Sequence, residues 1–213
     1  MMITTHEELM SYLKKNKYIK SPLIRDAFSS IDRKEFVPEN LKKVAYFDNP
    51  LPLGLGQTIS QPSTVAFMLE LLRPIPGDKI LDVGSGSGWQ SALLAHVVRS
   101  KNKKGMITAV ERIDDLLKKT EQNVEKFGFM KSGAVITILA DATKKSKPLP
   151  LYDKIIVAAS SDKENKLWVR QLKEGGRLVM PIKNSIYLFV KKDKDNITKK
   201  EYPGFSFVPL VVT

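Results

Sequence analysis

Apolar residues recur at helical spacing in two stretches of the first forty residues. Leu9 and Leu13 share one face of the first stretch. The second stretch carries Leu23, Ile24, Ala27, Phe28 and Ile31. Spacing of three and four residues predicts amphipathic helices. Ser21 and Pro22 suit the N-cap and first turn of the second helix. We expect the segment 33–38 to close this helical layer.

The segment 46–61 breaks that pattern. It is rich in proline and glycine and shows no strong periodicity. The segment is therefore either a long ordered loop or a disordered one. Long loops inside compact domains are usually functional.

From Thr64 onward, segments with helix and strand patterns alternate. The first is an amphipathic helix through Val65, Met68, Leu69 and Leu72. Strands are expected at 79–83, 106–111, 135–140, 152–158 and 177–181, and helices at 89–98, 113–127 and 164–172. This alternation predicts an α/β fold, a mostly parallel sheet with helices on both faces. We expect 186–191 and 205–212 to add antiparallel strands at one sheet edge.

No repeat or linker divides the chain, so we expect one domain over residues 1–213. Within it, residues 1–45 are predicted to form a helical cap, 46–63 a loop, and 64–213 the α/β core.

The glycine-rich run from Asp82 to Gly88 follows a predicted strand and opens a predicted helix, as a nucleotide-binding loop must. Glycine permits positive φ and lets backbone N–H groups approach a ligand. The spacing G-x-G-x-G differs from the dinucleotide pattern and favours S-adenosylmethionine over a pyrophosphate. Asp82 suits the ammonium group of that cofactor and argues against a nicotinamide.

Two further acidic residues end predicted strands behind the loop. Glu111 ends the next strand, where it can accept both ribose hydroxyls, and Asp141 ends the third, within reach of an adenine amino group. A glycine loop alone could be a simple strand–helix turn, but three acidic strand ends make a ligand the better interpretation. The expected cofactor residues are Asp82, Gly84, Ser85, Gly86, Gly88, Glu111, Asp141 and Ala142. The sequence thus predicts a Rossmann-like class I S-adenosylmethionine-dependent methyltransferase.

Composition sets limits on partners. The net charge of +12 raises the possibility of nucleic-acid binding. However, the lysine clusters lie in polar stretches without interleaved aromatic residues, so a solvated lysine-rich surface explains them better. There is no cysteine, hence no disulfide or thiolate metal site, and no metal is expected. No apolar run reaches the ~18 residues that span a bilayer, and the first residues do not resemble a secretion signal, so a cytoplasmic protein without a membrane partner is expected.

The segments 33–38, 45–62, 81–95, 148–157, 171–182 and 207–210 together resemble the protein-L-isoaspartate O-methyltransferase family. The match covers nearly the whole chain. The run GQTISQP at 56–62 is its specific part, whereas the glycine loop identifies only the superfamily.

The resemblance implies methyl transfer from S-adenosylmethionine to the free α-carboxylate of isoaspartyl residues in damaged proteins and peptides. The resulting ester would collapse to a succinimide that partly reopens to aspartate, and S-adenosylhomocysteine would be the other product. The family's key serine corresponds to Ser60, with Thr58 and Ile59 in the same site. A carboxylate with a pKa near ~4 is already ionised at pH 7, so no general base is required. Ser60 taken alone would be interpreted as a helix N-cap.

Three departures from the family pattern fall near the expected site. Ser63 stands where histidine or an aromatic residue is common, and we include it among the substrate-binding residues. Ala140-Asp141-Ala142 replaces a Gly-Asp-Gly pattern, and 158–162 differs after the fourth strand. The net charge of +12 and these departures keep two kinds of alternative open. One is a nucleic-acid or small-molecule methyltransferase, although the chain lacks an Asn/Asp-Pro-Pro-aromatic motif and a catalytic cysteine. The other is a non-catalytic module that only binds S-adenosylmethionine.

Overall fold

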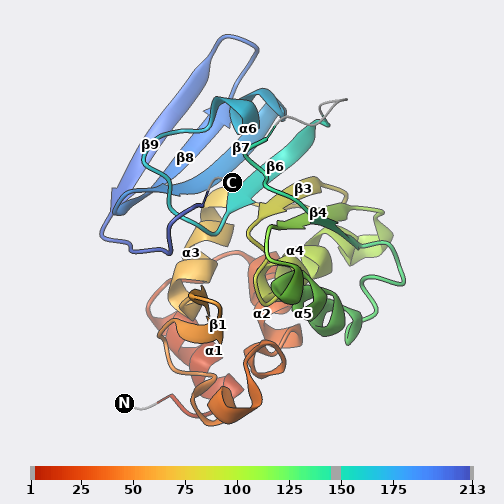
Figure 1. The fold of residues 1–213 in the computed structure, drawn as a ribbon, viewed down its shortest axis with the longest axis vertical. Helices are drawn as coiled ribbons and strands as arrows, with labels where there is room; N and C mark the ends of the chain where they lie inside the picture. Colours follow the sequence, from red (N-terminus) through yellow and green to blue (C-terminus); the bar gives the residue numbers. More distant parts are fainter. Residues whose placement is uncertain (1–2, 145–149, 212–213) are drawn as a thin grey trace.

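A computed structural model describes residues 3–144 and 150–211 (Figure 1). Its main sheet has seven strands in the order β5-β4-β3-β6-β7-β8-β9. The strands are β3 (Lys79–Val83), β4 (Met106–Glu111), β5 (Val135–Leu139), β6 (Tyr152–Val157), β7 (Leu172–Ile182), β8 (Ser185–Lys191) and β9 (Ile197–Pro203). The pairs from β5 to β7 are parallel, whereas β8 and β9 are added antiparallel. The predicted α/β fold with an antiparallel edge is confirmed.

The register of the parallel strands brings their carboxyl ends to one place. Val83 pairs with Val110 on one side and with Val157 on the other. Glu111 pairs with Leu139. Loops that follow these strands therefore meet at one edge of the sheet, which is where open α/β folds bind ligands.

Helices cover both faces of the sheet, but unequally. They are α1 (His6–Lys15), α2 (Pro22–Ser30), α3 (Pro62–Leu72), α4 (Trp89–Arg99), α5 (Asp114–Glu125) and α6 (Lys166–Arg170). Residues of α1 to α5 share one hydrophobic cluster with Ile80 and Ile156 of the sheet. Leu81 and Ile155, one position along, point to the opposite face and join Trp168 of α6. This alternation is the two-residue period of a strand buried on both sides.

The N-terminal helices form the predicted cap below the sheet (Figure 1). Thr5 and Glu8 make a capping box at the start of α1. Ser21 occupies the N-cap position of α2, as predicted, but its hydroxyl donates to Glu70 of α3 at 2.9 Å instead of capping the helix. The cap is thereby fastened to the first helix of the core.

The segment 46–61 is ordered and contains a short hairpin. β1 (Leu51–Gly54) pairs antiparallel with β2 (Gln57–Ile59). The turn between them has positive φ at Gly54, Leu55 and Gly56. Strands of four and three residues are too short to show a periodicity, so the sequence pattern did not predict this hairpin.

The predicted strand at 205–212 is wrong for the residues described. Up to Val211 this segment makes only an isolated bridge, between Pro209 and Ser160, and Val212 lies outside the described residues. The edge strand is instead β9, whose side chains are almost all exposed. A strand exposed on both faces needs no apolar alternation, so the sequence carried no signal for it.

The last helix and strand of the parallel series also differ in length from the prediction. α6 spans five residues instead of 164–172, because β7 begins at Leu172. Among the described residues, no helix is long and apolar enough to cross a membrane.

Candidate active site

Three adjoining hollows open at the carboxyl end of the parallel strands. We name them the strand-end cleft, the aromatic groove and the serine recess. Thr58 of β2 and Ala158, directly after β6, line all three. Ligands held in different hollows would therefore meet at these two residues.

The strand-end cleft encloses about 640 Å³, part of it open to solvent. This size suits a small-molecule ligand. Its walls come from the loops after β3, β4, β5 and β6, the hairpin and the C-terminal segment. The lining residues include Gln57, Thr58, Gly84, Gly86, Glu111, Arg112, Asp141, Ala142, Ala159 and residues 208–211.

The glycine loop between β3 and α4 has two functions. Gly86, at φ +55°, lines the cleft. Gly88, at φ +84°, does not: a Cβ there would come within 3.0 Å of Val124 and 3.1 Å of the Thr120 backbone in α5. Gly88 thus allows α4 and α5 to pack closely, and its expected place beside the ligand stays a prediction.

Ser85 lies beneath the loop. Its side chain is buried, and its Oγ lies 3.0 Å from Oγ1 of Thr120. The residue lines the serine recess and not the strand-end cleft, together with Ser60, Ser87 and Gln90. The recess therefore offers several neutral hydrogen-bonding side chains to a polar group.

Glu111 ends β4 with its carboxylate at the cleft. Oε2 accepts from the Gly86 N–H at 3.1 Å, and Oε1 accepts from the N–H groups of Arg112 (2.9 Å) and Ile113 (3.1 Å). A carboxylate has about four acceptor sites. These bonds leave acceptor capacity for a ligand, and the expected contact with both ribose hydroxyls stays a prediction.

Asp82 does not reach the cleft. It is fully buried, and its oxygens accept from Gln90 Nε2 at 2.7 Å and Ser91 Oγ at 2.5 Å. Burial raises the pKa of its carboxyl to about 6; the two hydrogen bonds lower the pKa and the charge of Glu111 raises it. Asp82 supports the loop from below by holding the start of α4, and a contact with an ammonium group stays a prediction.

Asp141 and Ala142 line the cleft where the sequence places them. Asp141 Oδ1 accepts from the backbone N–H and the hydroxyl of Thr143, at 2.9 and 2.6 Å. The Ala142 carbonyl accepts from Trp168 Nε1 at 3.0 Å. Alanine is accommodated in place of glycine because neither Ala140 nor Ala142 has a positive φ.

The C-terminal segment forms one wall of the cleft. The sequence predicted a strand at 205–212 and gave no indication of this position. The Val208 carbonyl accepts from the Ser160 N–H at 2.8 Å, and the Leu210 N–H donates to the Ser160 carbonyl at 2.6 Å. The Ser160 hydroxyl donates to the Lys183 carbonyl. The backbone of Ser160 therefore holds the tail over the cleft, whichever side chain stands there.

The aromatic groove lies beside the cleft. Tyr18, Phe67, Phe205 and Phe207 line it, with the rings of Phe67 and Phe205 stacked at 5.2 Å. A polar side is lined by Thr58, Ser60, Gln61, Ser63 and Thr64. No lysine or arginine among the described residues lines this groove.

The predicted acceptor residues divide between these hollows. Thr58 is exposed, and Ser60 lines both the groove and the recess. Ser60 is not the N-cap of α3, because Gln61 holds that position. Ile59 is only 3% exposed and packs in the core, and it lines the recess together with Thr58 and Ser60.

Ser63 lies at the buried end of the groove. Its N–H donates to Asp48 Oδ1 at 2.8 Å, and its Oγ accepts from Gln61 Nε2 at 2.9 Å. Gln61 Nε2 also donates to the other oxygen of Asp48 at 3.1 Å. Asp48 and Arg33, which organise this loop without lining the groove, were not singled out from the sequence.

Comparison with known proteins gives consistent matches. The family model described as protein-L-isoaspartate(D-aspartate) O-methyltransferase matches residues 4–213. Relatives named protein-L-isoaspartate O-methyltransferase include one from Methanopyrus kandleri, 39% identical over 209 residues (96% of this chain, 90% of the relative). One from Pyrococcus horikoshii is 40% identical over 205 residues (93% and 89%).

Solved structures agree. A Plasmodium falciparum structure bearing that enzyme name, in complex with S-adenosyl-L-homocysteine, superimposes with a TM-score of 0.87 at 27% identity. The match covers 97% of this chain and 98% of that one.

Proposed function

The chain belongs to the protein-L-isoaspartate(D-aspartate) O-methyltransferase family, and from that premise we propose which residues carry its reaction. The enzyme transfers a methyl group from S-adenosylmethionine to the free α-carboxylate of isoaspartyl residues in proteins and peptides. The observation that carries the residue assignment is the meeting of the cleft and the groove at Thr58 and Ala158.

The cleft and the recess suit S-adenosylmethionine, which supplies an electrophilic methyl group when bound. Gly84 and Gly86 line the cleft without a Cβ, and a Cβ at Gly86 would project toward Leu53 of the hairpin. Glu111 offers an acceptor at the end of β4. The polar side chains of the recess, Ser87 and Gln90 among them, suit the amino-acid end. Asp141 and Ala142 would border the adenine.

The aromatic groove suits the acceptor peptide. Residues 46–63 would act as the acceptor-site loop, with Thr58, Ser60 and Ser63 presenting hydroxyl groups. The isoaspartyl carboxylate is ionised at neutral pH and needs no base, only orientation. A serine hydroxyl can orient it by a hydrogen bond without a charge that would reduce its nucleophilicity. We assign this role to Ser60, because it borders both the groove and the recess.

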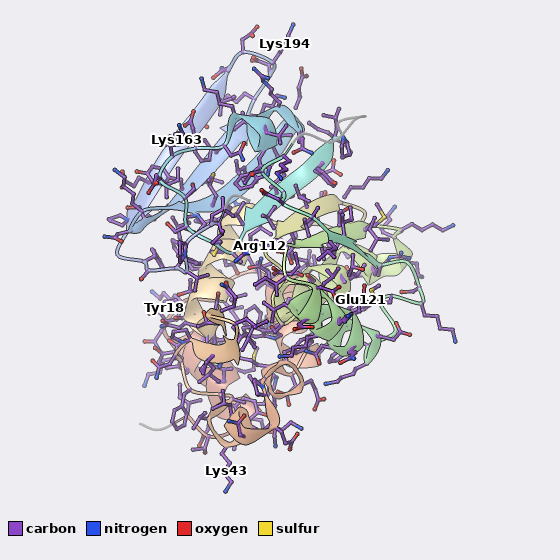
Figure 2. The ribbon with its side chains drawn as sticks, viewed as in Figure 1. Tyr18, Lys43, Arg112, Glu121, Lys163 and Lys194 are labelled. Atoms are coloured by element: carbon purple, nitrogen blue, oxygen red, sulfur yellow. The ribbon has the colours of Figure 1, made fainter. Side chains whose placement is uncertain are left out.

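The groove disfavours nucleic acid as the acceptor. Phosphate contacts come mainly from lysine and arginine, which are absent from its described lining. The basic residues lie elsewhere, as Lys43 and Lys194 illustrate by pointing outward at opposite ends of the molecule (Figure 2). Any binding of nucleic acid should be weak, without base preference, and lost at physiological salt.

A non-catalytic role has little to support it. Ser160 secures the tail, and Ser63 keeps a hydroxyl in the groove, so neither departure closes the acceptor site. A cytoplasmic location stays a prediction from the sequence.

The test compares three acceptors under identical conditions: an isoaspartyl peptide, the same peptide with normal aspartate, and bulk RNA. Incorporation of labelled methyl groups is measured. We expect methylation of the isoaspartyl peptide alone. The isoaspartyl linkage moves the free carboxylate onto the α-carbon, and a displacement of about 1 Å costs on the order of 100-fold in a reaction that depends on alignment. Equal methylation of both peptides, or methylation of RNA, would refute the assignment.

A further inference from the structure

We propose that Arg33 is a positioning residue for methyl transfer: its guanidinium clamps the base of the β1–β2 hairpin and so sets where Ser60 lies. This inference rests on the proposed function of Ser60. Arg33 lies in a short 3-10 helix of the N-terminal cap, Arg33–Phe36, and lines none of the three hollows.

One guanidinium holds both sides of the hairpin base. Nη1 donates to the carbonyls of Ala45, at 2.5 Å, and Phe47, at 3.2 Å. Nη2 donates to the carbonyls of Asn49, at 2.9 Å, and Ser60, at 3.1 Å. The first three acceptors precede the hairpin and the last follows it. The four bonds therefore hold the two ends of the hairpin together.

The burial of Arg33 is unusual. The residue is 0% exposed, has no carboxylate within 4.0 Å among the described residues, and its Nε has no acceptor there. Its guanidinium lies 5.5 Å from the centre of the Trp89 ring. Burial lowers the pKa of Arg33 to about 9, opposed by the charge of Asp48, so the group stays cationic at neutral pH.

Burying such a cation is costly, and an apolar side chain of similar volume often stabilises a fold as well or better. An apolar side chain could not, however, donate a hydrogen bond to any of the four carbonyl groups. The flat fork of the guanidinium can reach all four. The buried arginine therefore fixes the geometry of the loop, which an apolar side chain of the same volume could not do.

Asp48 closes the same loop from the other side. It accepts from the Ser63 N–H and from Gln61 Nε2, just beyond Ser60. Ser60 is thus held between an Arg33 bond to its own carbonyl and an Asp48 bond to the next residue. The tip of the hairpin has a separate support, because Lys119 Nζ donates to the Leu53 carbonyl at 3.3 Å. Loss of Arg33 should loosen the base without releasing the whole hairpin.

The expected consequence falls on the acceptor side. The glycine loop and Glu111 belong to other elements and make no hydrogen bond to Arg33. Displacing the serine should cost no more than removing its hydroxyl, which is about 10-fold for one lost hydrogen bond. Cofactor affinity should change far less than kcat for the peptide.

The experiment uses Arg33→Met, Arg33→Lys and a control, Leu13→Ala. Leu13 is fully buried in α1 of the same cap. It makes no hydrogen bond to the loop 46–63. Folding is checked by thermal unfolding, S-adenosylhomocysteine affinity by calorimetry, and kcat and KM with an isoaspartyl peptide. Hydrogen exchange of the amides of 48–60 reports on the loop directly.

For Arg33→Met we expect kcat to fall by up to about 10-fold, the loss expected for the Ser60 hydroxyl itself, with cofactor affinity within about threefold of wild type. Exchange in 48–60 should accelerate. Arg33→Lys keeps the charge but lacks the planar guanidinium, so its kcat should lie between those of Arg33→Met and wild type. Leu13→Ala should lose stability but keep kcat and slow exchange in 48–60.

Equal losses of kcat in Arg33→Met and Leu13→Ala would overturn the proposal, as would normal kcat in Arg33→Met. Failure of both Arg33 variants to fold would assign Arg33 to stability and also overturn it. If instead the wild-type protein binds cofactor but methylates no isoaspartyl peptide, the proposed function fails, and the exchange data still decide whether Arg33 holds the loop.

Discussion

The Gly86 N–H donates to Oε2 of Glu111 at 3.1 Å, which joins the glycine loop after β3 to the acidic end of β4. The two features that the sequence suggested as separate cofactor contacts are therefore one hydrogen-bonded unit. A change at either residue should affect both the cofactor site and the local backbone.

Replacing Glu111 with alanine should weaken S-adenosylhomocysteine binding by roughly 1–3 kcal/mol, the usual size for a lost charge-assisted bond. It should also lower the free energy of unfolding, because three backbone N–H groups lose their acceptor. Calorimetry and denaturant unfolding measure the two effects. Glu111→Gln, which keeps one carbonyl oxygen, serves as the control. Its cofactor affinity and unfolding free energy should lie between those of wild type and Glu111→Ala. Unchanged affinity in a folded Glu111→Ala variant would remove Glu111 from the cofactor site.

Two glycine substitutions should separate binding from packing. Gly86→Val should abolish S-adenosylhomocysteine binding in a protein that still folds, because a branched side chain at φ +55° strains the loop backbone that lines the cleft and projects toward Leu53 of the hairpin. Gly88→Ala should chiefly destabilise the fold, since its methyl group would meet the Thr120 backbone at 3.1 Å. Calorimetry and thermal unfolding are compared for both variants. A Gly86→Val variant that binds normally would contradict the assignment of this cleft.

Ser60→Ala should reduce kcat/KM for the isoaspartyl peptide by about 10-fold, the loss of one hydrogen bond of roughly 1–1.5 kcal/mol. Cofactor affinity should stay near wild type, because several other polar groups line the recess. Ser132→Ala is a matched control, since that hydroxyl only donates to the Phe129 carbonyl in an exposed turn. Equal kinetics for wild type and Ser60→Ala would mean that the hydroxyl does not orient the acceptor.

Asp82 should give the protein a distinct pH dependence of stability. Burial raises the pKa of its carboxyl from 3.8 to about 6. A raised folded-state pKa means that its stabilising contribution is complete below about pH 4 and is lost as the pH rises through about 6. Asp82→Asn keeps the shape and removes the titration. Unfolding free energies of both proteins should be measured from about pH 4 to about pH 7.

The wild-type protein should lose stability relative to Asp82→Asn by up to about 3 kcal/mol over that range. A constant difference between the two proteins would show that the carboxyl does not titrate there.

The sequence alone predicted the features that depend on neighbouring residues. Helical spacing located α1 to α5, and the alternation after Thr64 indicated the parallel sheet. The glycine loop and Glu111 were recognisable because a strand end, a glycine run and an acidic residue occupy fixed positions along the chain. The run at 56–62 indicated the acceptor segment because its residues are consecutive in the chain.

Tertiary structure decided the features that depend on residues distant in sequence. Asp82 lies below the loop because Gln90 and Ser91 take its oxygens once α4 packs on the sheet. The tail covers the cleft through backbone bonds to Ser160, which side-chain patterns cannot encode. Arg33 is indistinguishable in sequence from a surface arginine until folding surrounds it with four carbonyl groups. Periodicity reports which face of an element is buried, whereas the partner that each buried polar group finds depends on how the elements assemble.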